Sequence, residues 1–243
     1  HYKAFLSLRR AAARPTTQRQ LDITKVSAGL LGTNLADLLR PTEDDELRYG
    51  IVGAARNVRR FGLGLITAVK AFRLGLTNSV ILPAFLDDPH RGFSNRSSLQ
   101  SRVRLTGRIL DTLMTDLNNE DDPVCTGSSL GDSTVITVHG DSPKTPFRID
   151  NWADGMPRNS NYLYVLGNGY LKTGWFGQIR ANGDVDGFDP TTGDLVPGQR
   201  SSVTAAPAAA SALYAVAKGD MQRVRDFYDG PDITGLVNET PST

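Results

Sequence analysis

The chain has few of the residues that most sharply identify a function. A single cysteine, Cys125, occurs in 243 residues, which excludes an intrachain disulfide and a metal–thiolate cluster. The 27 basic and 26 acidic residues nearly cancel, so a formal charge of +1 provides no global field for nucleic acid or an anionic membrane. No apolar run is long enough to span a bilayer, and the printed sequence shows no signal-peptide pattern.

Common catalytic and nucleic-acid motifs are missing as well. The sequence contains no Gly-x-x-x-x-Gly-Lys phosphate loop and no Gly-x-Ser-x-Gly nucleophile elbow. Aromatic residues make up 7% of the chain and are scattered, so they do not form a stacking platform for single-stranded nucleic acid. A basic N-terminal segment is the remaining route to such a partner, and its affinity would fall steeply with salt. We therefore expect no nucleic-acid partner.

The chain divides by composition into a lead-in, a body and a tail. Residues 1–17 form a basic lead-in, residues 18–229 are expected to form a single α/β domain, and residues 230–243 a flexible tail. The sequence begins at His1 rather than at methionine, which is typical of a processed or partial product. We expect an upstream segment or other protein subunits as partners.

Three long helices are predicted before the middle of the chain. The first follows residue 18 and ends at Pro41, and a polar turn over residues 42–46 is predicted to be solvated and of the capping type. We expect its apolar surface to contact a missing N-terminal half or another subunit. Its apolar positions recur at helical spacing: Leu21, Val26, Leu30, Leu31, Leu35 and Leu38.

The second and third helices have stronger patterns. One apolar stripe predicts a helix over 61–76, with Gly75 placed as its C-terminal cap. A second stripe predicts a helix over 97–117. The basic side chains off the first stripe are expected to form a wetted face rather than a phosphate patch: Arg59, Arg60, Lys70 and Arg73.

Short apolar runs predict strands between and after these helices. Residues 79–83 and 134–138 are the first two, and the second is β-branched throughout, as is typical of the buried centre of a parallel sheet. The repeating order of helix and strand favours an α/β fold with right-handed crossovers. Further elements are predicted as a strand over 162–166, a hairpin around 181–183, and helices over 202–217 and 221–228.

Two polar loops follow the first two predicted strands and supply the candidate site. Asp87, Asp88 and His90 follow one strand, while His139 and Asp141 follow the other. Ligands sit just past the carboxyl ends of strands in open α/β sheets, and mixed aspartate and histidine suit Zn or Mn. Such a metal would polarise a phosphoryl or sulfuryl oxygen, or lower the pKa of a bound water.

The same residues have simpler interpretations. An Asp-Pro-His turn is an ordinary surface loop in many proteins, and a histidine at a strand end is often a hydrogen-bonded structural residue. Lys144 and Arg148 could hold an anion, or be solvated. No residue can be assigned a catalytic role from spacing alone.

The order of these segments resembles an uncharacterised family of exported bacterial proteins in the alkaline phosphatase and sulfatase superfamily. Its members carry Arg-Tyr-Gly before a long helix, then Trp-Asp-Thr-His, Gly-Glu-Phe-Gly-Arg-Thr-Pro, Gly-Arg-Asp-His and a triple-glycine turn. The likeness runs from Leu21 to Val216 and covers only the C-terminal half of such a member. The corresponding segments here are Arg48-Tyr-Gly50, Asp87-Asp-Pro-His90, Gly140-Asp-Ser-Pro-Lys-Thr-Pro146 and Tyr164-Val-Leu-Gly-Asn-Gly169.

The resemblance implies a mostly parallel sheet with flanking helices, incomplete without an upstream segment. It implies Asp88, His90 and Asp141 as ligands of a divalent metal (Zn, Mn or Ca), with Lys144 in place of an arginine. The later Asp-His pair is absent, no histidine follows His139, and the nucleophile of the superfamily lies upstream.

Two hypotheses follow from this comparison of motifs. The first is a structural or interaction protein on a degenerate scaffold, part of an exported assembly, because an activated nucleophile is what carries such a reaction. The alternative is a metal-dependent phosphate- or sulfate-ester hydrolase completed by an upstream segment or partner chain. The resemblance also implies a periplasmic or cell-surface location.

Overall fold

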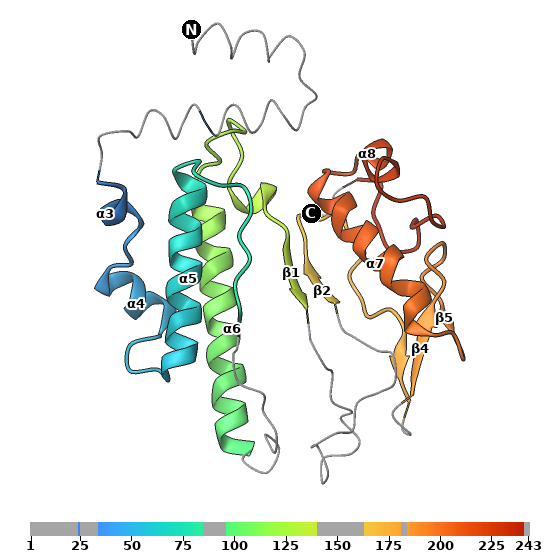
Figure 1. The fold of residues 1–243 in the computed structure, drawn as a ribbon, viewed down its shortest axis with the longest axis horizontal. Coiled ribbons are helices and arrows are strands. Elements are labelled where there is room, and N and C mark those ends of the chain that lie inside the picture. Colours follow the sequence, from blue (N-terminus) through green and yellow to red (C-terminus); the bar gives the residue numbers. More distant parts are fainter. Residues whose placement is uncertain (1–23, 25–33, 85–95, 140–162, 181–183, 241–243) are drawn as a thin grey trace, which may run out of the picture. The chain divides into compact units, whose positions relative to one another are not determined.

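The structure is a computed structural model that describes Thr24 and residues 34–84, 96–139, 163–180 and 184–240. The chain divides into two compact units (Figure 1). Unit 1 comprises His1–Asp88 and Ser97–Asp132, and unit 2 comprises Pro89–Arg96 and Ser133–Thr243. The described residues form helices and small antiparallel sheets, so the fold is mixed helix and sheet, as predicted at this coarse level. The sequence had suggested one domain over residues 18–229, and the two units divide that range.

Unit 1 is helical in its described part. Helices α5 and α6 run in the same direction, and their C-terminal ends are joined by an ion pair between Arg73 and Glu120 at 3.2 Å (Figure 1). The helices are α3 (Leu35–Leu39), α4 (Glu43–Tyr49), α5 (Arg56–Arg73) and α6 (Arg96–Asn119). The apolar core of unit 1 consists of Tyr49, Ile51, Val58, Ile66, Ala68, Val69, Ile109, Leu113, Leu117 and Leu130.

The end of α5 is set by the residue that the sequence indicates. Gly75 has a positive φ of 62°, a conformation that side chains with a Cβ rarely adopt. The Leu76 amide donates to the Ala71 carbonyl and the Gly75 amide to the Phe72 carbonyl, each at 2.9 Å. These two bonds satisfy carbonyls of the last turn and form a Schellman cap. The prediction for this helix end is confirmed.

The strand predicted over residues 79–83 is wrong. Residues 79–83 have no regular secondary structure, and Ile81 is 95% exposed. An apolar run becomes a strand only where a neighbouring strand accepts its backbone hydrogen bonds, and none of the described strands pairs with it. The segment instead places Leu82 against Gly64 of α5, where a Cβ would lie 3.3 Å from a Leu82 methyl.

Unit 2 contains the described strands, which pair only antiparallel. The predicted central strand is β1, and it pairs antiparallel with β2 rather than parallel, with Ile136 opposite Leu166. Its side chains alternate between half-buried and exposed, so β1 is not the fully buried strand that its composition predicted. The elements are β1 (Ile136–His139), β2 (Leu163–Leu166), β3 (Gln178–Ile179), β4 (Val185–Phe188), β5 (Leu195–Val196), α7 (Ser201–Val216) and α8 (Met221–Arg225), and β3, β4 and β5 form one sheet.

The segment after α8 packs into the core of unit 2. Ile233, Leu236 and Val237 are buried beside residues of α7 and α8. The Lys172 amide donates to the Leu236 carbonyl, and the Asn238 amide to that of Tyr170. This differs from the flexible tail expected over residues 230–243, because hydrogen bonds to residues far away in sequence fix the chain here.

Candidate functional site

The site residues predicted from the sequence lie outside the described residues. This applies to Asp88, His90, Asp141, Lys144 and Arg148. His139, at the end of β1, is described: it is exposed, and its Nε2 lies 3.1 Å from the Thr137 hydroxyl. Within residues 34–84, 96–139, 163–180 and 184–240, no group of three His, Cys, Asp or Glu side chains could hold a metal ion. The metal prediction therefore stays a prediction.

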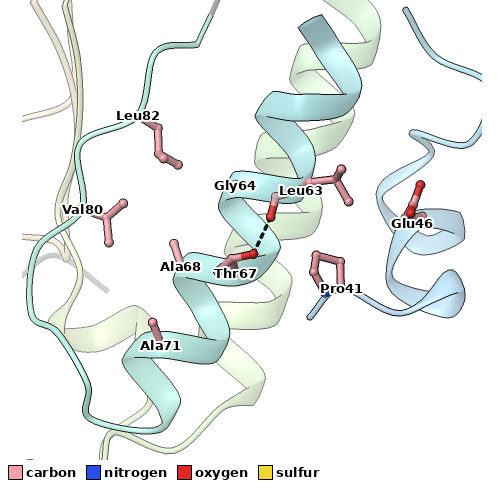
Figure 2. A pocket seen from close by; sticks show the side chains of 9 residues that line it. All are labelled: Pro41, Glu46, Leu63, Gly64, Thr67, Ala68, Ala71, Val80 and Leu82. Atoms are coloured by element: carbon pink, nitrogen blue, oxygen red, sulfur yellow. Dashed lines mark hydrogen bonds between the residues drawn. The ribbon is translucent and has the colours of Figure 1, made fainter. Parts of the chain in front are cut away.

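A groove lies over one face of α5 in unit 1 (Figure 2). We call it the α5 groove. Its volume is about 510 Å³. Aliphatic side chains and small residues supply most of its lining, which consists of Pro41, Glu46, Leu63, Gly64, Thr67, Ala68, Ala71, Val80 and Leu82.

The floor of the α5 groove is made of small residues on one face of the helix. Gly64, Ala68 and Ala71 are spaced four and three residues apart, which places them in one row along α5. The Thr67 hydroxyl donates to the Leu63 carbonyl at 2.9 Å, so its polar atom already has a partner within the helix. The floor therefore presents few polar groups that need a partner. Leu82 already packs on Gly64 and Ala68 is only 6% exposed, which leaves Thr67 and Ala71 as the more open positions of the floor.

The walls rise on opposite sides of this floor. Figure 2 shows Val80 and Leu82 on one side and Pro41 and Glu46 on the other. Glu46 accepts two hydrogen bonds from the Arg59 guanidinium, each at 2.7 Å, so the charge at this rim is paired. The α5 groove is thus an apolar channel with a neutralised rim, suited to apolar side chains rather than to a charged small molecule.

An ionic cluster fixes α4, which carries one wall of the groove, and it is largely buried except for Arg48, whose side chain is 50% exposed. We call this cluster the ionic clamp; it consists of Asp45, Arg48, Lys70 and Asp116. The Asp45 carboxylate lies 2.7 Å from both Lys70 Nζ and an Arg48 nitrogen, and Arg48 also pairs with Asp116 of α6. Asp45 and Thr42 form a reciprocal capping box at the start of α4. The clamp therefore ties α4 to both α5 and α6.

The electrostatics of the clamp follow from this geometry. Burial alone would raise the pKa of Asp45, but hydrogen bonds from Lys70, Thr42 and Arg48 outweigh it and hold that pKa well below its usual range. Burial raises the pKa of the Tyr49 hydroxyl, and the Asp116 charge raises it further. A hollow of about 200 Å³ lies beside the clamp. Because the acidic and basic groups of the clamp satisfy one another, we interpret it as structural.

The sequence pattern indicated the cap at the start of α4 but not the ionic clamp. The turn after Pro41 was predicted to be a solvated capping turn; the cap is present, but Asp45 within it is 9% exposed. The basic side chains of α5 were predicted to be a wetted face, and Arg59, Arg60 and Arg73 are exposed. Lys70 differs, because its side chain is only 15% exposed and pairs with Asp45. Arg59 and Arg73 also each pair with a carboxylate. The three-residue spacing of Thr42 and Asp45 was the feature of the sequence that could have indicated a helix starting here.

A second buried carboxylate organises unit 2. Asp186 on β4 is 1% exposed and accepts hydrogen bonds from Gln178 at 2.7 Å and from the Gly198 amide at 2.6 Å. It also pairs with Arg180, and these hydrogen bonds, with that from Arg180 first, hold the pKa of Asp186 well below its usual range. The cluster joins β3 and β4 to the turn after β5, which is a structural role.

Comparison with protein-family models, with curated proteins and with solved structures gave no match. Among the described helices, none combines the length and the apolar character needed to cross a membrane. The α5 groove is therefore the candidate site, interpreted from its own geometry.

Proposed function

We propose that this chain is a structural or interaction protein, and that the α5 groove receives an apolar helix of a polypeptide. The observation that supports this is the open channel of about 510 Å³ with a small-residue floor and aliphatic walls. Packed helices lie about 8–10 Å apart, and small contact residues favour the shorter distance. The floor of Gly64, Ala68 and Ala71 meets that condition.

The size of the groove sets the scale of the affinity. Burying one Leu or Val side chain contributes about 1.5–3 kcal/mol. Two or three such anchors would give about 3–9 kcal/mol before the cost of ordering the segment is subtracted. A free helix would then bind weakly, and a tethered one much better.

We also propose that the scaffold is a degenerate, mostly parallel sheet of the alkaline phosphatase and sulfatase type, completed by an upstream segment or another subunit of an exported assembly. In support, the described part of the β1–β2 sheet has two strands, and Tyr164 and Leu166 on it are 53% and 43% exposed. A two-stranded sheet is marginally stable on its own, so further strands would stabilise it.

Photo-crosslinking from the groove tests the proposed interaction. The photoreactive residue p-benzoylphenylalanine would replace Thr67 in the full chain. Thr115 of α6 is a matched control, because it is also a helical threonine whose hydroxyl donates to the carbonyl four residues earlier. We expect position 67 to capture polypeptide in high yield and position 115 to capture little. Equal, low yields at both positions would contradict an interaction at the groove.

A further inference from the structure

We infer that the occupant of the α5 groove is this chain's own N-terminal segment, residues 21–33, which binds in cis as a helix. The inference rests on the proposed function of the groove and adds the identity of its partner. Three observations support it: the segment joins unit 1 close to the groove, its apolar residues are spaced as on a helix face, and the groove provides only a modest affinity.

The segment joins unit 1 beside the groove. The segment leads directly into Asn34, which begins the range 34–84 of unit 1. Helix α3 packs against α5 directly after Asn34. The Arg40 carbonyl then accepts a hydrogen bond from Lys70 Nζ at 2.8 Å, and Pro41 forms part of the groove wall. Asn34, the short helix α3 and Arg40 thus separate the segment from Pro41 in the groove wall.

The segment has the composition that the groove requires. Ile23, Val26 and Leu30 are spaced at i, i+3 and i+7, which places them on one face of a helix, and they are aliphatic like the groove walls. Gly29 borders this face and lacks a Cβ, so the helix could approach a floor of small residues closely there, whereas Gly32 lies on the other side of the helix. The same glycines lower intrinsic helix stability by about 1 kcal/mol each, so this helix needs a surface to pack on.

The lengths agree as well. The groove floor extends from Leu63 to Ala71 on α5, which spans about 12 Å at about 1.5 Å per residue. Residues 21–33 as a helix would span about 20 Å. The segment therefore covers the whole floor and leaves residues for the turn that leads into Asn34.

The covalent connection of residues 21–33 to unit 1 favours binding within one molecule over binding to a second copy. A groove that contributes only a few kcal/mol binds a free helix weakly at micromolar protein concentration. A short tether raises the effective concentration of the segment to about the millimolar range. The covalently attached copy therefore outcompetes the same segment of another molecule.

Mapping the photo-crosslink tests the inference on the full chain. With p-benzoylphenylalanine at position 67, and separately at position 71, we expect a product of monomer mass whose crosslinked peptide derives from residues 21–33. Capture of a second copy, seen as a product of dimer mass, or of a different protein would overturn the inference but leave the proposed function intact. Capture of no polypeptide at either position would overturn both.

Hydrogen–deuterium exchange provides an independent measurement. Thr67→Arg places a long charged side chain on the floor, so residues 21–33 should exchange faster than in the unmodified chain. Thr115→Arg, the matched change on α6, should leave their exchange unchanged. If α5 itself loses protection in Thr67→Arg, the crosslink from position 71 decides. Unaltered exchange of residues 21–33 in a folded Thr67→Arg variant would overturn the inference.

Discussion

Neutralising Asp45 should destabilise unit 1 far more than the loss of an exposed ion pair would. In Asp45→Asn the side chain keeps its size and can still offer an oxygen to the Thr42 amide, which now donates to Asp45 at 2.9 Å. Arg48 would keep its partner Asp116. Lys70, whose side chain is only 15% exposed, would lose the carboxylate that now lies 2.7 Å away.

The expected cost follows from the burial of the pair. Removing one partner of a buried ion pair costs about 3–5 kcal/mol, because the remaining charge is left without compensation. Lys70 keeps its hydrogen bond to the Arg40 carbonyl at 2.8 Å, so we expect the lower end, about 3 kcal/mol. Adding Lys70→Met removes the isolated charge and should restore a large part of the loss, which gives a coupling energy of about 2 kcal/mol.

Native-state hydrogen–deuterium exchange can measure this effect for each unit separately. A loss of about 3 kcal/mol in the free energy of unfolding should accelerate exchange of the most protected α5 amides by about 100-fold. Amides of α7 in unit 2 serve as the internal reference and should not change. An α5 exchange rate within a fewfold of the unmodified chain would refute the argument. So would a double variant whose loss equals the sum of the two single losses.

Four other predictions follow from the structure. Because the folded pKa of Asp45 is depressed below the ordinary value of about 3.9, its stabilisation is present above that pH and is lost as the pH falls through the folded pKa. Protection of α4, corrected for intrinsic exchange, should therefore decline below about pH 4, and less so in Asp45→Asn. Asp186→Asn should accelerate exchange of β4 amides by more than about tenfold without changing α5, since it removes the charge that its donors face; unchanged β4 protection would contradict the role of this cluster. Gly235→Ala would place a Cβ 2.3 Å from a backbone nitrogen, so the segment after α8 should lose protection, with about 1–3 kcal/mol of destabilisation; a fully protected segment would show that the backbone relaxes. Metal analysis of the natively purified chain by mass spectrometry tests the hydrolase alternative: near-stoichiometric Zn, Mn or Ca that is lost on Asp141→Ala and His90→Ala would support it, and no metal after incubation with excess would remove it.

Sequence patterns located α5 and α6 because helix formation is largely a local matter, but residues 42–46 were predicted as a turn and instead begin α4. The stripe that predicts 61–76 lies on α5, which begins at Arg56, and the stripe over 97–117 lies on α6. Each has many turns of consistent spacing, and α5 also has the left-handed residue that ends it. Helix α7 was likewise predicted, over 202–217 with an interruption at Pro207, but the helix continues through Pro207.

Strand partners and buried loops could not be predicted in the same way. The β-branched run at β1 shows that the chain is extended there, but it does not specify the antiparallel partner β2, which lies more than 20 residues away. Ile233 is fully buried although its neighbours are turn residues, because its environment comes from α7 and α8. The α5 groove could not be predicted either. Val80 and Leu82 form one of its walls, but the sequence pattern assigned residues 79–83 to a strand of the sheet.

The charges of unit 1 explain how a nearly neutral chain builds an apolar site. Helix α4 begins with four consecutive acidic residues, and α5 carries only basic charges. Within each helix these like charges repel one another. Between the helices, Lys70 pairs with Asp45 and Arg59 pairs with Glu46, which offsets part of that repulsion. These pairs lie on one side of α5, and the small residues of the groove floor lie on the opposite side of the helix. The ionic clamp and the α5 groove are therefore two faces of one arrangement, in which the pairing that holds α4 in place also positions the wall that Pro41 and Glu46 contribute.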